Sequence, residues 1–231
     1  MNKVLKRIAK RLPTRYQQEL KRLRFGHQIR KGTFKTDEEE FGMLESWVGK
    51  GDWVLDIGAN VGHYTSRLSE IVGATGRVIA FEPVPETFEL LAANVARFPL
   101  KNVTLINIAV SDSADILGIS IPKFDTGLDN YYQAGVTNEV AELRVLCAPI
   151  DSFGFLQCSK NEASSKNIKL AKIDVEGHEL AVLKGMERLL NRDHPVLIVE
   201  GDSPEVASYL GVFGYSGRKI EGSPNTIYCC S

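Results

Sequence analysis

The sequence predicts an α/β protein with a mostly parallel, doubly wound sheet and helices on both faces. Short apolar runs of strand length alternate with amphipathic segments of helix length along most of the 231 residues. Three of the apolar runs end on an acid, at Asp56, Glu82 and Glu200. Acids at the carboxyl ends of parallel strands lie where open α/β sheets bind their ligands. The same pattern therefore predicts both a fold and a ligand-binding edge.

The first 35 residues differ from the rest in charge. They contain twelve Lys or Arg and a single acid, Glu19, although the whole chain has a net charge of −1. Within them, one face of a short helix ending at Pro13 is apolar: Val4, Leu5, Ile8 and Leu12. Such a helix can lie on an anionic membrane or dock on the domain or on a second subunit, and its apolar stripe favours docking. We predict a basic helical extension over residues 1–35 and one folded domain over 36–231.

The folded domain is expected to begin with a capped helix. Thr36 and Glu39 have the spacing of a capping box, and Phe41, Leu44 and Val48 follow at helical spacing. A buried strand then runs from Val54 into Asp56, and a helix begins after Gly62. The sequence thus predicts a strand, a tight loop and a helix N-terminus in one short stretch.

That loop carries the ligand signature Asp56-x-Gly58-x-Asn60-x-Gly62. Glycine takes positive φ freely and lets a ligand approach the backbone, and Asn tolerates the same region. The dinucleotide fingerprint G-x-G-x-x-G is not met, because its second and third glycines are missing. The acid–glycine spacing is instead that of S-adenosylmethionine (SAM) sites. An NAD-dependent dehydrogenase is therefore disfavoured.

The next unit supplies a candidate ribose ligand. A strand over residues 77–82 ends at Glu82, which lies twenty residues beyond Gly62. At this distance a carboxylate at the tip of the second strand accepts the two hydroxyls of a ribose. A helix from Pro85, ended by Pro99, and a third strand over residues 103–110 follow.

Residues 111–165 are predicted to hold a substrate-lid insertion. Two short strands are expected, over residues 116–121 and 143–146, and the polar, aromatic stretch between them includes Tyr131 and Tyr132. Long loops in compact domains usually serve function. The competing interpretation is that this stretch is a surface segment with no role in substrate binding.

The remaining chain completes the sheet. We expect a strand over residues 168–175, a helix over about 179–190 and a strand over residues 195–200. Ser203 then caps a further helix, and residues 218–221 and 225–230 form a C-terminal antiparallel hairpin.

Together these pieces resemble the FkbM family of SAM-dependent O-methyltransferases. The resemblance rests on residues 56–62, 81–85, 109–112, 172–179 with Gly185, and Val199-Glu200, and residues 172–179 are its most diagnostic string. It implies a Rossmann-like class I methyltransferase fold with a seven-stranded sheet. It also implies methylation of a hydroxyl on a sugar, glycan, polyketide or similar small molecule. The predicted SAM-binding residues are Asp56, Gly58, Ala59, Asn60, Gly62, Glu82 and Pro83, with Asn107 and Ala109 near the adenine by fold position.

Methyl transfer from a sulfonium to an alcohol needs alignment and a group that takes a proton. We expect Asp174 to orient or deprotonate the acceptor, with His178 as the rival base and Lys172 adjusting the charge of Asp174. The plainer interpretations are a helix-capping acid for Asp174 and a surface residue for His178. Asp174, Glu176 and Glu200 have the chemistry to hold Mg²⁺, but we expect no metal.

Two other functions stay open at this stage: an RNA 2′-O-methyltransferase, suggested by the basic N-terminus, and a catalytically silent SAM-fold partner subunit. Nucleic acid is not the expected partner, because no aromatic–basic motif accompanies the charges. No apolar run reaches the ~18 residues of a membrane span, and the four cysteines suit a reducing compartment. We therefore expect a cytoplasmic protein, either monomeric or oligomeric.

Overall fold

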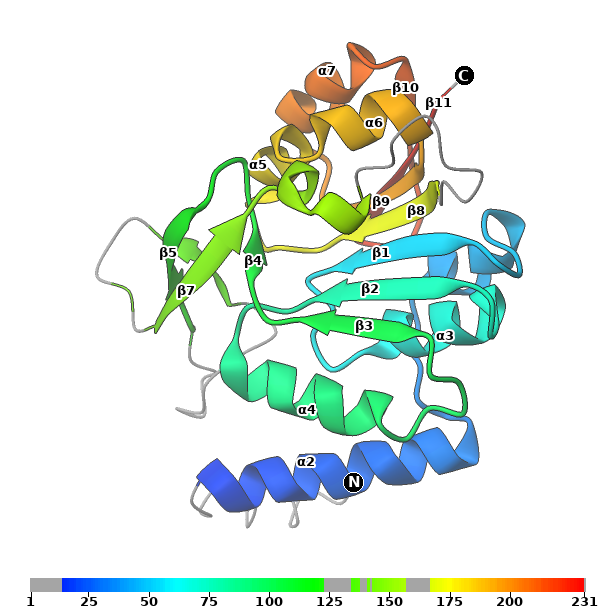
Figure 1. Ribbon diagram of the computed structural model, residues 1–231, viewed down its shortest axis with the longest axis vertical. Coiled ribbons are helices and arrows are strands. Elements are labelled where there is room, and N and C mark those ends of the chain that lie inside the picture. Colours follow the sequence, from blue (N-terminus) through cyan, green and yellow to red (C-terminus); the bar gives the residue numbers. More distant parts are fainter. Residues whose placement is uncertain (1–13, 123–133, 138–140, 142, 157–166, 231) are drawn as a thin grey trace.

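A seven-stranded sheet forms the centre of the molecule (Figure 1). The computed structural model describes residues 14–122, 134–137, 141, 143–156 and 167–230. The strand order is β10-β11-β9-β8-β1-β2-β3, and β11 runs antiparallel to both its neighbours while the other adjacent pairs are parallel. The strands are β1 (Trp53–Ile57), β2 (Arg77–Phe81), β3 (Val103–Ile106), β8 (Ile168–Ile173), β9 (Val196–Glu200), β10 (Tyr215–Lys219) and β11 (Asn225–Cys230). This confirms the predicted sheet and its C-terminal hairpin.

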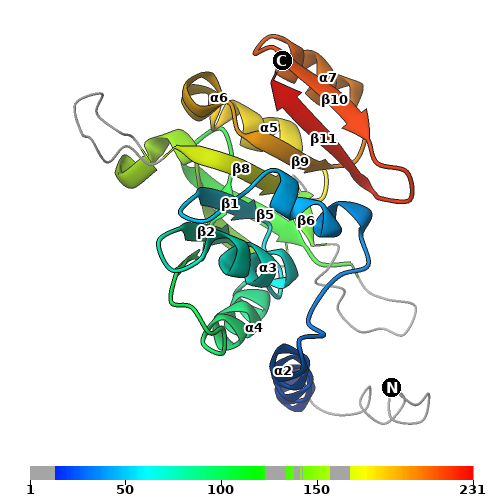
Figure 2. The same ribbon diagram turned by 90° about the vertical axis from the view of Figure 1, so that its right-hand side faces the viewer.

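Helices cover both faces of this sheet (Figures 1 and 2). Alternate residues of a strand point to opposite faces, so Val54 packs with Leu68 of α3 while Leu55 belongs to the cluster that contains Leu183 and Leu210 on the other face. The helices are α2 (Thr14–Lys31), α3 (His63–Val72), α4 (Pro85–Val95), α5 (Glu179–Lys184), α6 (Glu187–Asp193) and α7 (Pro204–Gly211). Ser203 caps α7 as predicted, accepting the amide N–H of Val206.

A smaller sheet lies beyond the carboxyl ends of the central strands, at the left of Figure 1. Its order is β4-β7-β5-β6, with β4 (Ala109–Val110), β5 (Asp115–Ser120), β6 (Gly135–Thr137) and β7 (Leu143–Ala148). The predicted third strand over residues 103–110 is therefore wrong as one element. It divides at Asn107, and its second part pairs with β7 instead of β2. The predictions for Tyr131 and Tyr132 lie outside the described residues.

The predicted capping box is also wrong. Residues 36–38 are extended, and two short 3-10 helices follow, η1 (Glu39–Gly42) and η2 (Leu44–Ser46). Glu38 occupies the N-cap position, where no side-chain cap bond forms within the described chain. The acids of this segment turn inward instead: Glu40 is fully buried, and the hydroxyl of Tyr64 donates to Glu38. Tertiary contacts have overridden a local helix signal.

The helix expected over residues 179–190 is two helices, separated at Gly185. A Cβ at Gly185 would lie 1.9 Å from the carbonyl oxygen of Ser111, so the chain passes against a neighbouring backbone there. Two more 3-10 turns, η4 (Ile150–Ser152) and η5 (Gly154–Leu156), pack beside α6. The close approach between Gly185 and Ser111 fixes the segment that follows β8.

The N-terminal helix α2 packs against α4 at the periphery. Phe25 joins a small apolar cluster with Phe34, Val61 and Leu90, and Arg22 forms an ion pair with Glu89 at 3.2 Å. The predicted apolar face of residues 4–12 lies outside the described residues. Among the helices that the structure describes, none has the length and hydropathy to cross a bilayer.

Candidate active site

The loop between β1 and α3, residues 58–62, is built on left-handed backbone angles, and we call it the glycine loop. Gly58, Asn60 and Gly62 have φ values of 78°, 49° and 95°. A Cβ at Gly58 would lie 1.7 Å from the carbonyl oxygen of Asp174, and one at Gly62 would lie 2.7 Å from Leu91. This confirms the prediction that both ends of the loop need glycine. A side chain at Gly58 would collide with backbone, and one at Gly62 would collide with a core side chain.

Asp56 precedes the glycine loop and is fully buried. Its Oδ2 accepts the Thr65 hydroxyl at 2.5 Å, while its Oδ1 has no hydrogen-bond partner among the described residues. Burial raises the pKa of Asp56, although the nearby charge of Lys172 opposes this. A buried carboxylate oxygen without a donor fits a ligand that brings one.

Glu82 follows β2 and is held by backbone amides. Its Oε2 accepts the N–H of Asn60 at 2.9 Å, and its Oε1 accepts the N–H of Val84 at 3.0 Å. The side chain is 5% exposed, and burial raises its pKa to about 7. These bonds join the glycine loop to the end of β2 and fix both carboxylate oxygens.

A pocket with about 630 Å³ of open space lies between the glycine loop, the end of β2 and the small sheet. This first pocket is lined by Gly58, Asn60, Glu82, Pro83 and Ala109, which are five of the predicted SAM residues. It lies at the carboxyl ends of the central strands, where open α/β sheets bind their ligands. Further walls come from Val84, Ile108, Val110, Ile119, Ala134 and Val136, which the sequence analysis did not identify.

Asn107 hydrogen-bonds the chain that follows β2, and its predicted place near the adenine stays a prediction. Its Nδ2 donates to the carbonyl oxygens of Glu82, at 2.8 Å, and Pro83, at 3.1 Å. It is exposed and is not among the residues that line the first pocket. Asn107 therefore braces the chain after β2, while Ala109 and Ile108 contribute the wall.

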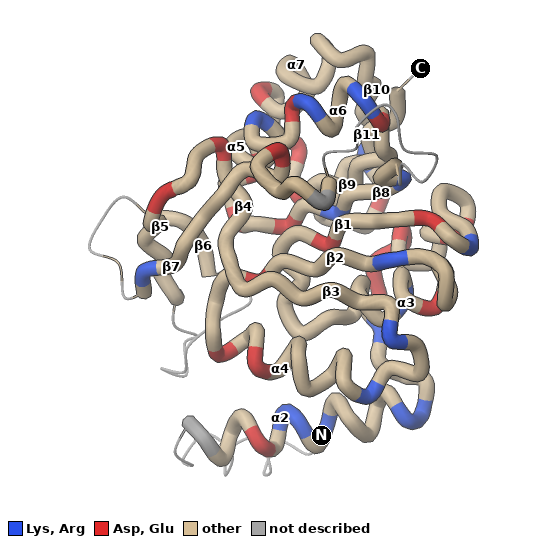
Figure 3. The backbone as a smooth tube through the Cα atoms, viewed as in Figure 1, with Lys and Arg blue, Asp and Glu red and all other residues tan. Residues whose placement is uncertain are grey.

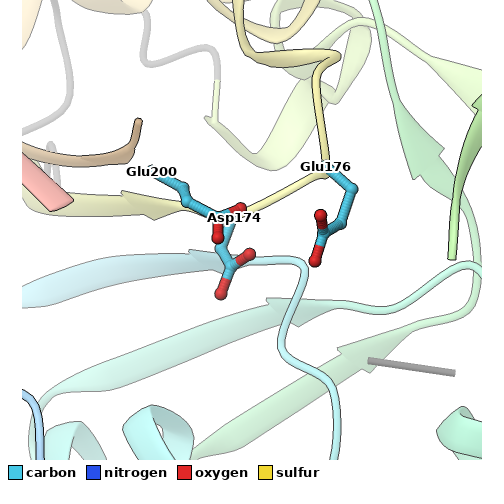
Figure 4. Close-up of side chains that lie close together, drawn as sticks. All are labelled: Asp174, Glu176 and Glu200. Atoms are coloured by element: carbon cyan, nitrogen blue, oxygen red, sulfur yellow. The ribbon is translucent and has the colours of Figure 1, made fainter. Parts of the chain in front are cut away.

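The ends of β8 and β9 carry a charged group that we call the β8–β9 cluster: Lys172, Asp174, Glu176 and Glu200. Lys172 Nζ lies 2.6 Å from Asp174 Oδ2, as expected for residues two apart on one side of a strand. The carboxylates of Asp174, Glu176 and Glu200 each offer an oxygen within 4.8 Å of the others, and Figure 4 shows all three converging. These are the residues named above as candidate metal ligands, and the expectation of a metal-free site stays a prediction.

Charge is distributed unevenly within this cluster. Burial favours a raised pKa for Asp174, but the charge and hydrogen bond of Lys172, with a hydrogen bond from Glu200, bring it below its usual value. Burial and the charge of Asp174 raise the pKa of Glu200 to about 8. At neutral pH the geometry therefore holds an ionised Asp174 between an ammonium and a carboxylic acid.

Lys172 is buried against the aromatic ring of Tyr64. It is 4% exposed, and its Nζ lies 4.8 Å from the centre of the Tyr64 ring. The Tyr64 hydroxyl lies 2.5 Å from Glu38 Oε2 and 3.0 Å from Glu40 Oε1, and Asn225 donates to Glu40. Burial would lower the pKa of Lys172, but Asp174 and Asp56 outweigh it and raise that pKa. Nothing in the local sequence around Glu38 signals its contact with Tyr64, the residue whose ring lies against Lys172.

A second pocket opens on the other side of the glycine loop. It is lined by residues 35–38, by Ala59, His63 and Tyr64, and by the side of the β8–β9 cluster that carries Lys172. Gly58, Asn60 and Asp174 line both pockets. His63 packs its ring 4.3 Å from that of Phe34, and burial lowers its pKa to about 4, so it contributes packing.

The segment after Asp174 places two more polar groups in the first pocket. Glu176 has a φ of 51°, a left-handed angle that costs a non-glycine residue energy and that persists mostly at functional sites. His178 precedes α5, and its Nε2 lies 2.9 Å from the Oγ of Ser111. Burial lowers the pKa of His178, so its ring is neutral at pH 7. Ser111 belongs to a motif that the sequence analysis matched, but no role was predicted for it.

One protein-family model matches the part of the chain that contains both the glycine loop and the β8–β9 cluster. The model of the "Methyltransferase FkbM domain" matches residues 56–216. The chain belongs to the FkbM methyltransferase family. The predicted resemblance is thereby confirmed, and with it SAM as the cofactor. The FkbM domain spans both the glycine loop and the β8–β9 cluster.

Solved structures show the same fold. A methyltransferase FkbM from Methylobacillus flagellatus is 17% identical, with a TM-score of 0.53, over 78% of this chain and 43% of that one. Fibrillarin from Aeropyrum pernix, in complex with natively bound SAM, is 14% identical with a TM-score of 0.50, over 82% of this chain and 72% of that one. At these identities the likeness concerns the fold alone.

The names of the curated relatives point to different classes of acceptor. The hexuronic acid methyltransferase AglP of Haloferax volcanii is 31% identical over 147 residues, which are 64% of this chain and 55% of that protein. A probable cobalt-precorrin-6B C(15)-methyltransferase (decarboxylating) of Saccharolobus solfataricus is 27% identical over 169 residues, 68% of this chain and 81% of that one. The chain thus spans about half of AglP, and it is a SAM-dependent methyltransferase whose acceptor atom the relatives do not fix.

Proposed function

We propose that this FkbM domain transfers the methyl group of SAM to a hydroxyl of a small molecule or saccharide. The observation that carries the proposal is the first pocket, where Asp174, Glu176 and His178 face the same space as Asn60 and Glu82. One side of the pocket is suited to a nucleoside and the other to a polar acceptor.

The residues present fit SAM. The glycine loop lets the cofactor approach the backbone at Gly58 and Asn60, with Ala59 and Gly62 completing the turn. The carboxylate of Glu82, fixed by two backbone amides, suits the two ribose hydroxyls, while Pro83 and Ala109 form a wall. The unpartnered Oδ1 of Asp56 suits a cationic donor such as the methionine ammonium. When bound, SAM supplies an activated methyl group on a sulfonium.

The charged side of the pocket favours a hydroxyl acceptor. Asp174 and Glu176 would repel an acceptor carboxylate, whereas a hydroxyl can donate a hydrogen bond to Asp174. Lys172 keeps Asp174 ionised and therefore ready to accept that bond. Asp174 thus orients the acceptor for in-line displacement, which supplies much of the rate enhancement.

His178 is the residue placed to receive the proton. Its lowered pKa keeps the ring neutral near pH 7, and a neutral imidazole can accept a proton at the nitrogen that is not protonated. The Ser111 hydroxyl, 2.9 Å from Nε2, holds the ring in one orientation. In this assignment Asp174 orients the acceptor hydroxyl, His178 takes its proton, and Lys172 keeps Asp174 ionised.

The relatives support a saccharide acceptor without deciding it. AglP is named for methylation of a hexuronic acid, which carries both hydroxyl and carboxyl groups, and the precorrin relative is named for methylation of carbon. The carboxylates of the β8–β9 cluster favour the hydroxyl among these three choices. RNA 2′-O-methylation and a silent partner role remain the alternatives predicted from the sequence.

Product analysis tests the proposal. The full chain is incubated with isotope-labelled SAM and an extract of its source cells, and labelled products are characterised by mass spectrometry and by NMR. A methyl ether on a saccharide or other small molecule, stable to mild alkali, is the expected product. A methyl group on carbon, an alkali-labile methyl ester, label in RNA, or no transfer would each overturn it.

A further inference from the structure

The outer face of α2 has a surface that methyl transfer does not use. Leu23 is 67% exposed, Tyr16 49% and Leu20 46%. These are three of the six large hydrophobic side chains that are exposed in the described part of the chain. In Figures 1 and 2, α2 lies at the edge of the molecule with α4 on one side. Because these three residues are spaced four and three apart, they lie together on one face of the helix. Grouped exposed apolar side chains, unlike scattered ones, mark interaction sites.

Basic residues flank these apolar side chains on the same face. With 100° per residue, Tyr16, Leu20, Leu23 and His27 form the middle of one stripe, and Arg24, Arg30 and Lys31 form its two borders. All seven are exposed. Figure 3 shows basic residues recurring along α2. Within the described residues, no carboxylate lies within ion-pair distance of Arg24, Arg30 or Lys31. The stripe therefore has Tyr16, Leu20 and Leu23 near its centre and arginine or lysine at both borders. Glu19 lies next to Arg30 on one border and pairs with Arg22.

The inner face of α2 is fixed to the domain and holds this stripe outward. Phe25 and Ile29 belong to the apolar cluster with Leu90 and Phe98, and Arg22 is paired with Glu89. α2 also has 18 residues, long enough to present the whole stripe as one rigid surface. The stripe is thus a built feature of the fold, and its side chains are exposed in the described part of the chain.

We propose that the outer face of α2 docks on an anionic lipid membrane. Leucine and tyrosine at the centre of a cationic stripe fit the boundary between headgroups and acyl chains, where apolar burial and attraction to anionic lipids add. Nucleic acid would pair with the arginines but would leave Leu20 and Leu23 in water. The thirteen residues before α2 carry five more Lys or Arg and no acid, which strengthens attraction to the same surface.

Docking in this orientation leaves the active site open. The strands of the central sheet run roughly along α2 in Figure 1, and their carboxyl ends open at one end of the molecule, away from the outer face of α2. The inference is independent of the identity of the acceptor, because it places the enzyme at a membrane without closing the first pocket.

Vesicle sedimentation tests the docking. The full chain is mixed with vesicles of phosphatidylcholine alone or of phosphatidylcholine with phosphatidylglycerol. We expect binding to the anionic vesicles only, falling with added salt. Replacing Arg24 and Lys31 by Gln should weaken binding about 25-fold, at about fivefold per basic residue. Replacing Leu20 and Leu23 by Ser should weaken it about tenfold or more, from the lost burial of apolar surface.

The matched control uses another exposed apolar pair. Ile116 and Leu146 are cross-strand partners, 57% and 65% exposed, and replacing both by Ser should leave vesicle binding unchanged. SAM affinity, measured by calorimetry, checks that each variant is folded. The proposal is overturned if the wild-type chain ignores anionic vesicles, or if the Leu20/Leu23 variant binds them as well as wild type. It is also overturned if these leucines instead hold two copies together in sedimentation velocity, or if the chain prefers an RNA oligonucleotide to the vesicles.

Discussion

The glycine loop and the β8–β9 cluster both contribute residues to the first pocket, but they are held in different ways. The glycine loop is fixed by backbone angles and by a close approach between Gly58 and the carbonyl of Asp174. The β8–β9 cluster is fixed by charges, because Lys172 is buried against Asp174, which in turn shares a hydrogen bond with Glu200. Backbone geometry suits the recognition of a constant cofactor, whereas adjustable charges suit proton and hydroxyl chemistry.

The largest effect is expected when the charge of the cluster is changed. Asp174→Asn keeps the shape of the side chain but removes the charge that accepts the acceptor hydroxyl and balances Lys172. Methyl transfer should fall about a hundredfold, the size of effect expected when an acceptor is no longer held in line. The initial rate with labelled SAM and the acceptor found by product analysis measures this. A rate close to that of wild type would leave Asp174 with only a structural role.

Breaking the glycine loop should cost stability as well as binding. Gly58→Ala places a Cβ against the Asp174 carbonyl at a φ of 78°, so the free energy of unfolding should fall by about 3 kcal/mol. Thermal unfolding and SAM titration measure the two losses. Gly211→Ala is the control, because a Cβ there meets nothing within 4 Å and needs no unusual φ. Equal behaviour of the two variants would contradict the close approach.

Glu82 combines the two features, because it is a titrating group and is also held by backbone amides. Its pKa is about 7 in the folded chain and 4.5 when exposed, so its protonated form stabilises the fold below pH 4.5 and this stability is lost as pH rises to about 7. The loss amounts to about 3 kcal/mol. Denaturant unfolding across this range should show a steeper decline in wild type than in Glu82→Gln, where the raised pKa of Glu200 still contributes.

SAM affinity should change with pH in the opposite direction. In the proposed site the ionised carboxylate of Glu82 accepts both ribose hydroxyls, so we expect SAM to bind more tightly as pH rises through about 7. Calorimetric titrations of wild type and Glu82→Gln check this. An affinity that is independent of pH in wild type would remove Glu82 from the ribose site.

The smallest effect is expected at Glu176, the residue of the β8–β9 cluster that has a left-handed backbone angle. Glu176→Gly relieves a φ of 51°, so the free energy of unfolding should rise by about 1 kcal/mol while methyl transfer declines. His194→Gly relieves a φ of 46° far from the pocket, and it should stabilise without changing the rate. If both variants retain full activity, the strain at Glu176 has no part in catalysis.

The sequence predicted most of the glycine loop because its determinants are local. Gly58, Asn60 and Gly62 are required by backbone angles, and Glu82 follows at a fixed distance along one strand–helix unit. The alternation of apolar runs likewise predicted the sheet and the hairpin. Such features are encoded within about thirty residues of chain.

What the sequence did not predict depends on contacts between distant residues. Thr36 and Glu39 match a capping box, yet Glu38 and Glu40 turn to Tyr64 and Asn225. The strand after Val103 divides because Asn107 donates to the backbone after β2. The pairing of Ser111 with His178 and the pocket wall from Ile119 and Val136 arise from the small sheet, whose strands are short and irregularly spaced.

A SAM titration of the Asp174→Asn variant tests the division between the two regions most directly. The account predicts that SAM binds this variant within about threefold of wild type, because backbone groups of the glycine loop and the Glu82 carboxylate hold the cofactor. The expected loss is confined to methyl transfer. A fall in SAM affinity of about tenfold or more, equivalent to 1.4 kcal/mol, would show that the β8–β9 cluster itself binds the cofactor and would contradict the account.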